Sequence, residues 1–223
     1  MSDNQVEKNI PRANHLVITV GRQFGSGGRE LGRKIADLLG IKYYDKELLS
    51  HAASDAGLSQ EFVENNDERF PRFISSAISF SMGFNSMSWY QNPTSISGDS
   101  IYETQSEVIR QLAAAGPCVI VGRSADYVLR DNPFTVNIFV HAPAECCNDR
   151  IMARSDISSR AKADKLRRQT NKLRAAYYNF YTDKHWGDAA SYDLCFDTSL
   201  LPAEAIAEIV AQYVRRRFPQ LAI

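Results

Sequence analysis

A glycine-rich turn near the amino terminus has the residue types and spacing to bind phosphate. Gly25, Ser26, Gly27 and Gly28 stand between an apolar run rich in β-branched residues and a segment with helical periodicity. Glycine tolerates positive φ and lets backbone N–H groups approach an anion, because no Cβ stands in the way. The amino terminus of the following helix would add unpaired N–H groups and a partial positive charge. The pattern predicts a phosphate-binding turn; a tight strand-to-helix connection is the alternative.

The turn matches neither of two common phosphate-binding patterns in full. A P-loop reads G-x-x-x-x-G-K-[ST], but five residues separate Gly21 from Gly27, and Gly28 occupies the place of the lysine. The dinucleotide pattern G-x-G-x-x-G fits at Gly25 and Gly27, but Glu30 takes its third glycine position. The turn by itself therefore leaves both classes of nucleotide-binding protein open.

Asp45 keeps the dinucleotide alternative open. It lies twenty residues after Gly25, at the end of a strand-like run, where dinucleotide-binding enzymes hold a ribose. The same residue is equally suited to cap a helix that begins at Lys46. The rest of the chain has to decide what the turn binds.

The elements that would position this turn alternate between strands and helices. Five runs rich in Val, Ile, Tyr and Phe are predicted to be strands: Leu16–Val20, Lys42–Tyr44, Cys118–Val121, Thr135–Val140 and Tyr192–Phe196. Helical patterns are found at Gly28–Leu39, Tyr102–Ala115 and Pro202–Phe218. Strands that alternate with helices are typical of a parallel sheet covered on both faces. We expect an α/β fold with a five-stranded parallel sheet and helices on both faces.

Three segments depart from this alternation. Residues 1–14 form a polar tail, ahead of one expected domain at residues 15–223. Residues 58–100 are expected to form a helical insertion with a loose loop. Residues 150–188 are dense in Arg and Lys, and we expect an arginine-rich lid because the guanidinium group suits phosphate oxygens. A solvated helix face is the alternative. An apolar stripe in this segment fits one face of a helix: Leu166, Thr170, Leu173, Tyr177 and Phe180.

Composition and charge argue against several classes of function. The 223 residues include 26 Lys and Arg and 26 Asp and Glu, and a net charge of zero argues against a general nucleic-acid-binding surface. No apolar run approaches the roughly 18 residues needed to cross a membrane, and the amino terminus has no apolar signal segment. The cysteines and histidines show no metal-ligand spacing. We expect a cytoplasmic protein without a metal site of its own, in which any metal arrives with a nucleotide.

Four blocks of sequence cover most of the chain in a fixed order. They are Gly25–Arg33 continuing to Tyr43–Leu48, Glu103–Ile109 running into Gly116–Tyr127, Tyr177–Thr182 with Trp186–Asp188, and Tyr192–Ser199. In order and spacing these blocks resemble the cytidylate kinase-like family, a divergent branch of the nucleoside monophosphate kinases. The resemblance implies the P-loop kinase fold, with an acceptor-binding insertion after the second strand and an arginine-rich lid.

The resemblance also implies a reaction, the transfer of the γ-phosphoryl group of ATP to a small-molecule nucleotide, with CMP or dCMP expected and Mg²⁺ as cofactor. The backbone of Gly25, Ser26, Gly27 and Gly28 would hold the ATP phosphates. Arg29 would supply the charge that the missing lysine does not. Arg150 and Arg154 lie one helical turn apart and form the expected arginine pair of the lid, with a catalytic role. No oligomeric state is indicated.

The acceptor site implied by the resemblance lies after the second and third strands. Asp45 matches the acidic residue near the acceptor nucleotide, and Arg123 matches the arginine of a Gly-Arg-Asp element that contacts it. Gly122 precedes that arginine, and Asp126 stands two residues beyond the usual acid. A structural ion pair is the alternative role for Arg123. The tyrosines near residue 180 and Trp186 are suited to stack on a base or to pack in the core.

Several departures from the family pattern support a different function. Besides Gly28, Val121 replaces an acid that helps at the magnesium site, and His51 replaces an acceptor-binding arginine. These changes favour a catalytically weakened nucleotide-binding regulator or sensor as the alternative to a kinase. A dinucleotide-dependent oxidoreductase and a kinase for another small molecule remain further alternatives.

Overall fold

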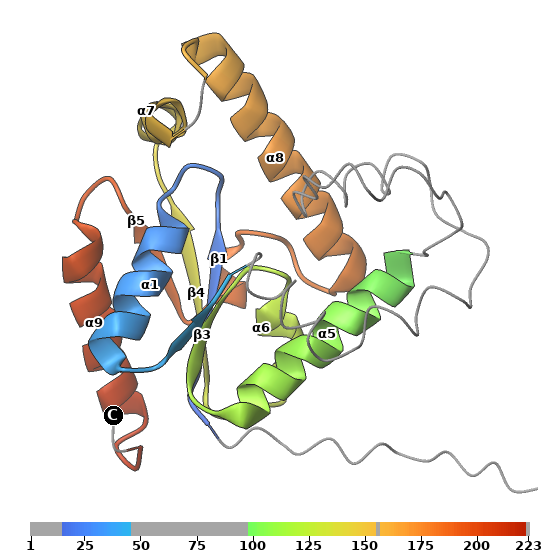
Figure 1. Ribbon diagram of the computed structural model, residues 1–223, viewed down its shortest axis with the longest axis vertical. Helices are drawn as coiled ribbons and strands as arrows, with labels where there is room; N and C mark the ends of the chain where they lie inside the picture. The colour runs from blue at the N-terminus through green and yellow to red at the C-terminus, as the bar shows by residue number, and fades with distance from the viewer. Residues whose placement is uncertain (1–14, 46–97, 155–156, 222–223) are drawn as a thin grey trace, which may run out of the picture.

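The computed structural model describes residues 15–45, 98–154 and 157–221 (Figure 1). The expected tail at residues 1–14 lies outside these ranges, as does nearly all of the expected insertion at residues 58–100. His51 lies outside them too. None of the helices within the described ranges is both long and apolar enough to cross a membrane.

The sheet has five strands that all run parallel. They are β1 (Val17–Arg22), β2 (Lys42–Tyr44), β3 (Cys118–Val121), β4 (Thr135–His141) and β5 (Leu194–Asp197). Their order across the sheet is β2-β3-β1-β4-β5, so β1 lies in the centre. Ile18 of β1 pairs with Val119 of β3 on one side and with Val136 of β4 on the other. The predicted five-stranded parallel sheet is confirmed.

Helices cover both faces of this sheet (Figure 1). On one face lie α1 (Gly28–Leu39) and α9 (Ala203–Arg217), and on the other lie α5 (Gly98–Ala115) and the short α6 (Ala125–Val128). Successive side chains of a strand point to opposite faces. Ile18 and Val20 of β1 accordingly pack with α1 and α9, whereas Val17 packs with α5 and α6.

The basic segment forms helices near the carboxyl ends of the strands. Here α7 (Ala144–Arg154) is followed by α8 (Arg160–Tyr181) and by a 3₁₀ turn, η2 (Ala189–Ser191). The buried residues of α8 are Ala163, Thr170 and Tyr178. Phe180 is 54% exposed, so its predicted place on the buried stripe is wrong. Tyr178 lies on the buried face of α8, because its hydroxyl contacts Asp126 of α6.

The boundaries of three strands differ from those predicted, and β4 differs only in that it continues by one residue to His141. β1 continues to Arg22, because Gly21 and Arg22 keep pairing with Phe139 and Val140 of β4. β5 begins at Leu194, two residues later than expected. The apolar pattern of β1 ends before its hydrogen-bonded ladder does. This extension places the arginine at the carboxyl edge of the central strand.

Candidate functional site

The glycine turn connects the carboxyl end of β1 to α1. Gly25 and Gly27 both have φ of 81°, in the left-handed region. Gly27 is the N-cap of α1 and no side chain caps it, so the first N–H groups of the helix face the turn without a side-chain acceptor. The Ser26 hydroxyl donates instead to the Gln23 carbonyl at 2.9 Å. A Cβ at Gly25 would lie 2.6 Å from the Cys147 carbonyl oxygen, so glycine lets α7 pack against the turn.

Thr198, which follows β5, joins the turn to α7. Its hydroxyl donates to the Ser26 carbonyl at 2.6 Å and also lies 3.2 Å from the His141 carbonyl oxygen. Arg150 of α7 donates through Nη1 to the Thr198 hydroxyl at 3.0 Å and through Nη2 to the Thr198 carbonyl at 2.7 Å. The guanidinium is thereby held beside the turn: a Cβ at Gly27 would lie 3.8 Å from Nη1.

Arg154 has a different environment from Arg150. Its Nη2 lies 2.7 Å from Oε2 of Glu30, in the first turn of α1. The two side chains are 56% and 50% exposed, so the ion pair contributes about 0–1 kcal/mol to stability. A hollow next to this pair is lined by Gly27, Glu30, Leu31, Arg150, Thr198, Leu201, Pro202, Ala203 and Glu204. Of the predicted arginine pair, Arg150 lines this hollow and is held by Thr198, whereas Arg154 is not among the lining residues and pairs with Glu30 of α1.

Three arginines from different elements converge on a second cavity at the carboxyl edge of the sheet. Arg22 ends β1, Arg123 follows β3 and Arg174 lies in α8, and all three line the cavity. Arg174 donates through Nη1 to the Arg22 carbonyl at 3.0 Å. The Arg22 guanidinium packs so closely on Gly122 that a Cβ there would overlap Nη1. Among the described residues, no carboxylate forms an ion pair with any of the three.

The electrostatics of this arginine cluster (Arg22, Arg123 and Arg174) favour an anion. Loss of water contact and the charges of Arg174, Arg123 and Arg29 hold the pKa of Arg22 well below its ordinary value. Loss of water contact and Arg29 likewise lower the pKa of Arg123. The same two causes, with Arg123, lower the pKa of Arg174 to about 10. Arginine keeps its proton at neutral pH, so the shifts reflect repulsion and desolvation that a bound anion would relieve.

The backbone that presents Arg123 is strained. Gly122, Arg123 and Ser124 have φ of 83°, 64° and 52°, three consecutive left-handed residues of which two are not glycine. A left-handed conformation costs about 1–2 kcal/mol for a residue with a Cβ. Such strain is often found at functional sites. The Ser124 hydroxyl is buried, lines the cavity and has no hydrogen-bond partner within the described ranges.

Asp126 lines the same cavity from α6. Its Oδ2 accepts a hydrogen bond from the Tyr178 hydroxyl of α8 at 2.6 Å. Burial raises the pKa of Asp126 above its ordinary value, although the bond from Tyr178 and the charge of Lys184 oppose the shift. Asp126 therefore joins α6 to α8. It stands two residues after the position of the usual acid, and at this position it bonds to Tyr178.

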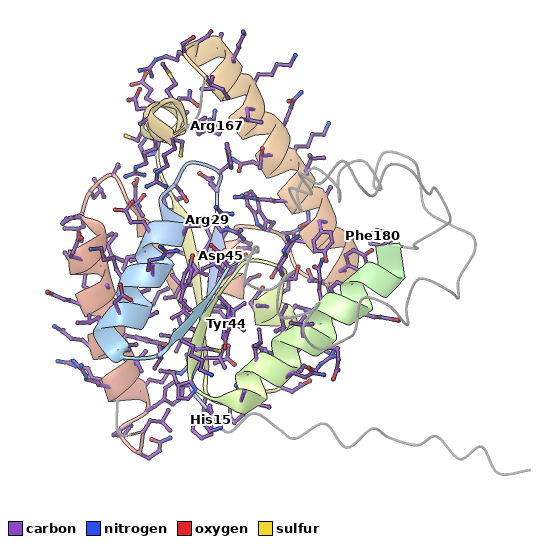
Figure 2. The ribbon with its side chains drawn as sticks, in the orientation of Figure 1. His15, Arg29, Tyr44, Asp45, Arg167 and Phe180 are labelled. Carbon is purple, nitrogen blue, oxygen red and sulfur yellow. The ribbon has the colours of Figure 1, made fainter. Side chains whose placement is uncertain are left out.

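Asp45 and Arg29 lie together at the end of β2 and the start of α1 (Figure 2). Tyr43 joins them, because its hydroxyl is 3.4 Å from Oδ2 of Asp45 and 3.3 Å from the Arg29 carbonyl oxygen. Asp45 is buried, whereas Arg29 is exposed. Burial and the Asp45 charge raise the pKa of Tyr43 to about 12, so its hydroxyl stays a proton donor at neutral pH. The alternative role of Asp45 as a helix cap involves residues outside the described ranges.

The aromatic residues of the third block pack on two sides. Tyr181 stacks on Tyr102 of α5, with ring centroids 4.3 Å apart, and Tyr177 contacts both rings. Trp186 packs edge-on against Phe139 of β4 at 5.4 Å. Much of this cluster therefore joins α8 to its neighbours. Tyr177 and Trp186 also line the cavity of the arginine cluster, where a base could contact them.

Part of this arrangement is predictable from the sequence. The turn at residues 25–28, Gly122, Arg123 and Asp126 do lie at the carboxyl edge of the sheet. The sequence does not predict Arg22, because the apolar pattern of β1 ends at Val20, and it does not distinguish Arg174 from the other basic residues of α8. Thr198 carries no recognisable signal in the sequence, since its role depends on the loop after β5 folding back on the turn.

The turn does not fit a magnesium ion held by protein side chains. In a P-loop the Ser or Thr after the lysine gives its hydroxyl to Mg²⁺, and Arg29 stands at that position here. The described residues include no group of three or more His, Cys, Asp and Glu placed to hold a metal. In kinase sites Mg²⁺ takes most of its ligands from substrate phosphates and water, which does not require such a group of protein side chains.

Comparison with known proteins resolves the alternatives that the turn leaves open. The sequence profile of the cytidylate kinase-like family matches residues 17–200. The chain belongs to this family. A curated relative, a cytidylate kinase of Pyrococcus horikoshii, is 28% identical over 199 residues, which cover 87% of this chain and 86% of that protein. The resemblance found in the four blocks is confirmed.

Solved structures agree with this assignment of fold. An uncharacterized protein from Eubacterium ventriosum superposes with a TM-score of 0.67 at 25% identity, covering 90% of this chain and 98% of that one. A gluconokinase from Sinorhizobium meliloti has a TM-score of 0.50 at 15% identity and covers 92% and 94%. A shikimate kinase from Bacteroides thetaiotaomicron has a TM-score of 0.50 at 11% identity and covers 92% and 99%. The kinases show the fold alone, which is that of P-loop kinases.

Proposed function

We propose that this chain transfers the γ-phosphoryl group of ATP to a nucleoside monophosphate, with CMP or dCMP as the expected acceptor. The arginine cluster beside the glycine turn carries the proposal. Phosphoryl transfer depends on positioning and charge neutralisation more than on covalent chemistry. Cations from three elements, without carboxylate partners among the described residues, are suited to that task.

The donor nucleotide fits the side of the site formed by the turn. The uncapped amino terminus of α1 would accept the ATP phosphates, as helix termini commonly accept anions. Arg150 lies beside Gly27 and lines the adjacent hollow with Thr198 and Leu201. This hollow is contiguous with the turn, and we assign the nucleoside of ATP to it.

The acceptor fits the opposite side, between β3 and α8. Arg123 and Arg174 would bind its phosphate, because planar guanidinium groups match phosphate oxygens. Tyr177 and Trp186 line the cavity on that side and offer aromatic surfaces to a base. Asp45, buried at the end of β2, would accept a hydrogen bond from the nucleoside.

A catalytically weakened nucleotide-binding regulator or sensor is the second candidate. Gly28 in place of the P-loop lysine and Val121 in place of the strand acid favour it. Such a protein would bind ATP through the same turn and hollow but would transfer no phosphoryl group. The two candidates therefore differ in turnover and agree in ATP binding.

The test is an assay of the purified protein with ATP, Mg²⁺ and a panel of ribo- and deoxynucleoside monophosphates. Mass spectrometry detects the diphosphates. We expect diphosphate from CMP or dCMP in preference to the others, lost in Arg123→Ala and kept in Arg216→Ala, which changes an exposed arginine of α9. ATP binding without diphosphate from any acceptor would reject the kinase for that panel and support the sensor.

A further inference from the structure

Two positions of the P-loop pattern are occupied by the wrong kind of residue in this chain, one by a cation and one by a glycine. In G-x-x-x-x-G-K-[ST], the first glycine lies five residues before the second. When the pattern is counted back from Gly27, Arg22 stands where the first glycine belongs, and Gly28 stands where the lysine belongs. The chain thus has a cation in place of a glycine and a glycine in place of a cation, six residues apart.

These two positions meet in space. Arg22 follows Ile18 and Val20 on the face of β1 that packs against α1. Its side chain therefore leaves the strand toward the first residue of that helix. A Cβ at Gly28 would lie 2.7 Å from Cβ and 3.0 Å from Cγ of Arg22. The stem of Arg22 occupies the space into which a side chain at position 28 would extend.

The far end of Arg22 lies in the cavity of the arginine cluster. Its guanidinium packs on Gly122, where a Cβ would overlap Nη1, and faces the charges of Arg123 and Arg174. Within the described residues it has no carboxylate partner. The side chain therefore starts beside Gly28, the first residue of α1, and its charge lies at Gly122 in the cavity of the arginine cluster.

We propose that Arg22 supplies to the ATP phosphates the side-chain cation that a lysine supplies in a standard P-loop, and that Gly28 and Gly122 give its side chain the room to do so. This inference rests on the proposed binding of ATP at the turn, and it does not require phosphoryl transfer. It replaces the expectation that Arg29 compensates for the lysine, because Arg29 is exposed on the first turn of α1.

The experiment exchanges the two residues and measures ATP affinity by calorimetry, without any acceptor. We expect Arg22→Gly to weaken ATP binding about ten- to a hundredfold, as for loss of a charge-assisted hydrogen bond. Adding Gly28→Lys to that variant should recover most of the affinity. The lysine can extend into the space that the stem of Arg22 occupied, and it can bind the ATP phosphates as in a standard P-loop. Arg216→Ala serves as the control and should bind ATP like the wild type.

A second measurement tests the steric part without a nucleotide. Gly28→Ala alone should lower the thermal unfolding midpoint by about 2–6 °C, because its Cβ meets the stem of Arg22. In the Arg22→Gly background the same change should leave the midpoint unchanged or raise it, as alanine normally does in a helix. Equal effects of Gly28→Ala in both backgrounds would overturn the steric claim.

The outcomes separate this inference from the kinase. A wild-type protein that binds ATP no better than Arg22→Gly would overturn the role of Arg22, whatever the turnover. Failure of Gly28→Lys to improve ATP binding in the Arg22→Gly background would also overturn it. Loss of affinity in Arg22→Gly with recovery in the exchange would support the inference even if the wild type transferred no phosphoryl group.

Discussion

At the scale of single residues, the arginine cluster lowers the stability of the protein without a ligand. Arg22, Arg123 and Arg174 lose water contact, and repulsion from neighbouring arginines, including Arg29, lowers the pKa of each further. A bound phosphate would reverse both effects. Burial and the charges of Arg29 and Arg123 lower the pKa of Arg174 to about 10, and a bound phosphate would raise it again. Residues that are costly without a ligand are typical of binding sites.

Replacement of Arg123 by glycine should separate stability from function. Glycine adopts the φ of 64° without strain, so Arg123→Gly should stabilise the free protein by about 1 kcal/mol. The same variant should lose diphosphate formation by about a hundredfold or more, since a cation that contacts phosphate is removed. Urea unfolding and the turnover assay provide the two measurements. A variant that is less stable and fully active would contradict both the strain and the site.

Asp126 should make stability depend on pH with a defined sign. Burial raises its pKa in the folded protein above the value of 3.8 that we take for the unfolded chain. Between these two values the folded state binds more protons, so stability falls as pH rises. Asp126→Asn keeps an acceptor for Tyr178 without the charge, so its stability relative to the wild type should increase through that window. Urea unfolding at a series of pH values tests this; a difference independent of pH would contradict it.

At the scale of elements, the loop after β5 acts as a brace for the glycine turn. Thr198 contacts the Ser26 carbonyl, and Arg150 of α7 bonds to the hydroxyl and the carbonyl of Thr198. The turn, α7 and the end of β4 are therefore linked through Thr198, which also contacts the His141 carbonyl oxygen. This linkage explains how glycines with few conformational limits can hold a fixed shape.

Removal of the Thr198 hydroxyl should loosen the turn. Thr198→Val keeps the shape of the side chain but leaves the Ser26 carbonyl and one Arg150 donor without their partner, which should cost about 1–3 kcal/mol. ATP affinity should fall in parallel, because the turn loses its fixed conformation. Urea unfolding and calorimetry measure the two effects.

The serine variant provides the matched control for this brace. Thr198→Ser retains the hydroxyl and should stay close to the wild type in ATP affinity. If Thr198→Val and Thr198→Ser behaved alike, the hydroxyl would have no role in holding the turn.

At the scale of the whole molecule, the parallel sheet brings the two proposed halves of the site to its carboxyl edge. In the proposed function, the turn, α1 and α7 form the donor side, and β3, α6 and α8 form the acceptor side; Figure 1 shows where these elements lie. The arginine cluster has one residue at the end of the central strand, Arg22, and two from the proposed acceptor side, Arg123 after β3 and Arg174 of α8. Ligands bind at this edge of open α/β sheets as a rule.

The sequence predicts most of the fold and less of the site. Alternating apolar runs are enough to predict all five strands, because buried parallel strands need near-continuous β-branched and aromatic residues. The apolar pattern does not include Arg22, because the hydrogen bonds of β1 to β4 continue for two residues after the last apolar residue, Val20. The sequence also does not predict which face of α8 is buried. The helix is polar, and two tyrosines, Tyr177 and Tyr178, are adjacent, of which Tyr178 is the buried one. Contacts such as that of Thr198 arise from the tertiary fold and have no local signature.

The binding of a bisubstrate analogue tests most directly whether the two halves form one phosphoryl-transfer site. In such an analogue adenosine and cytidine are joined through a polyphosphate chain. If the halves are connected by the arginine cluster, the analogue should bind at least about a hundredfold more tightly than ATP, because the second nucleotide is held at high effective concentration. Arg123→Gly should lose this excess and keep its affinity for ATP. An analogue that binds the wild type no more tightly than ATP would contradict the account.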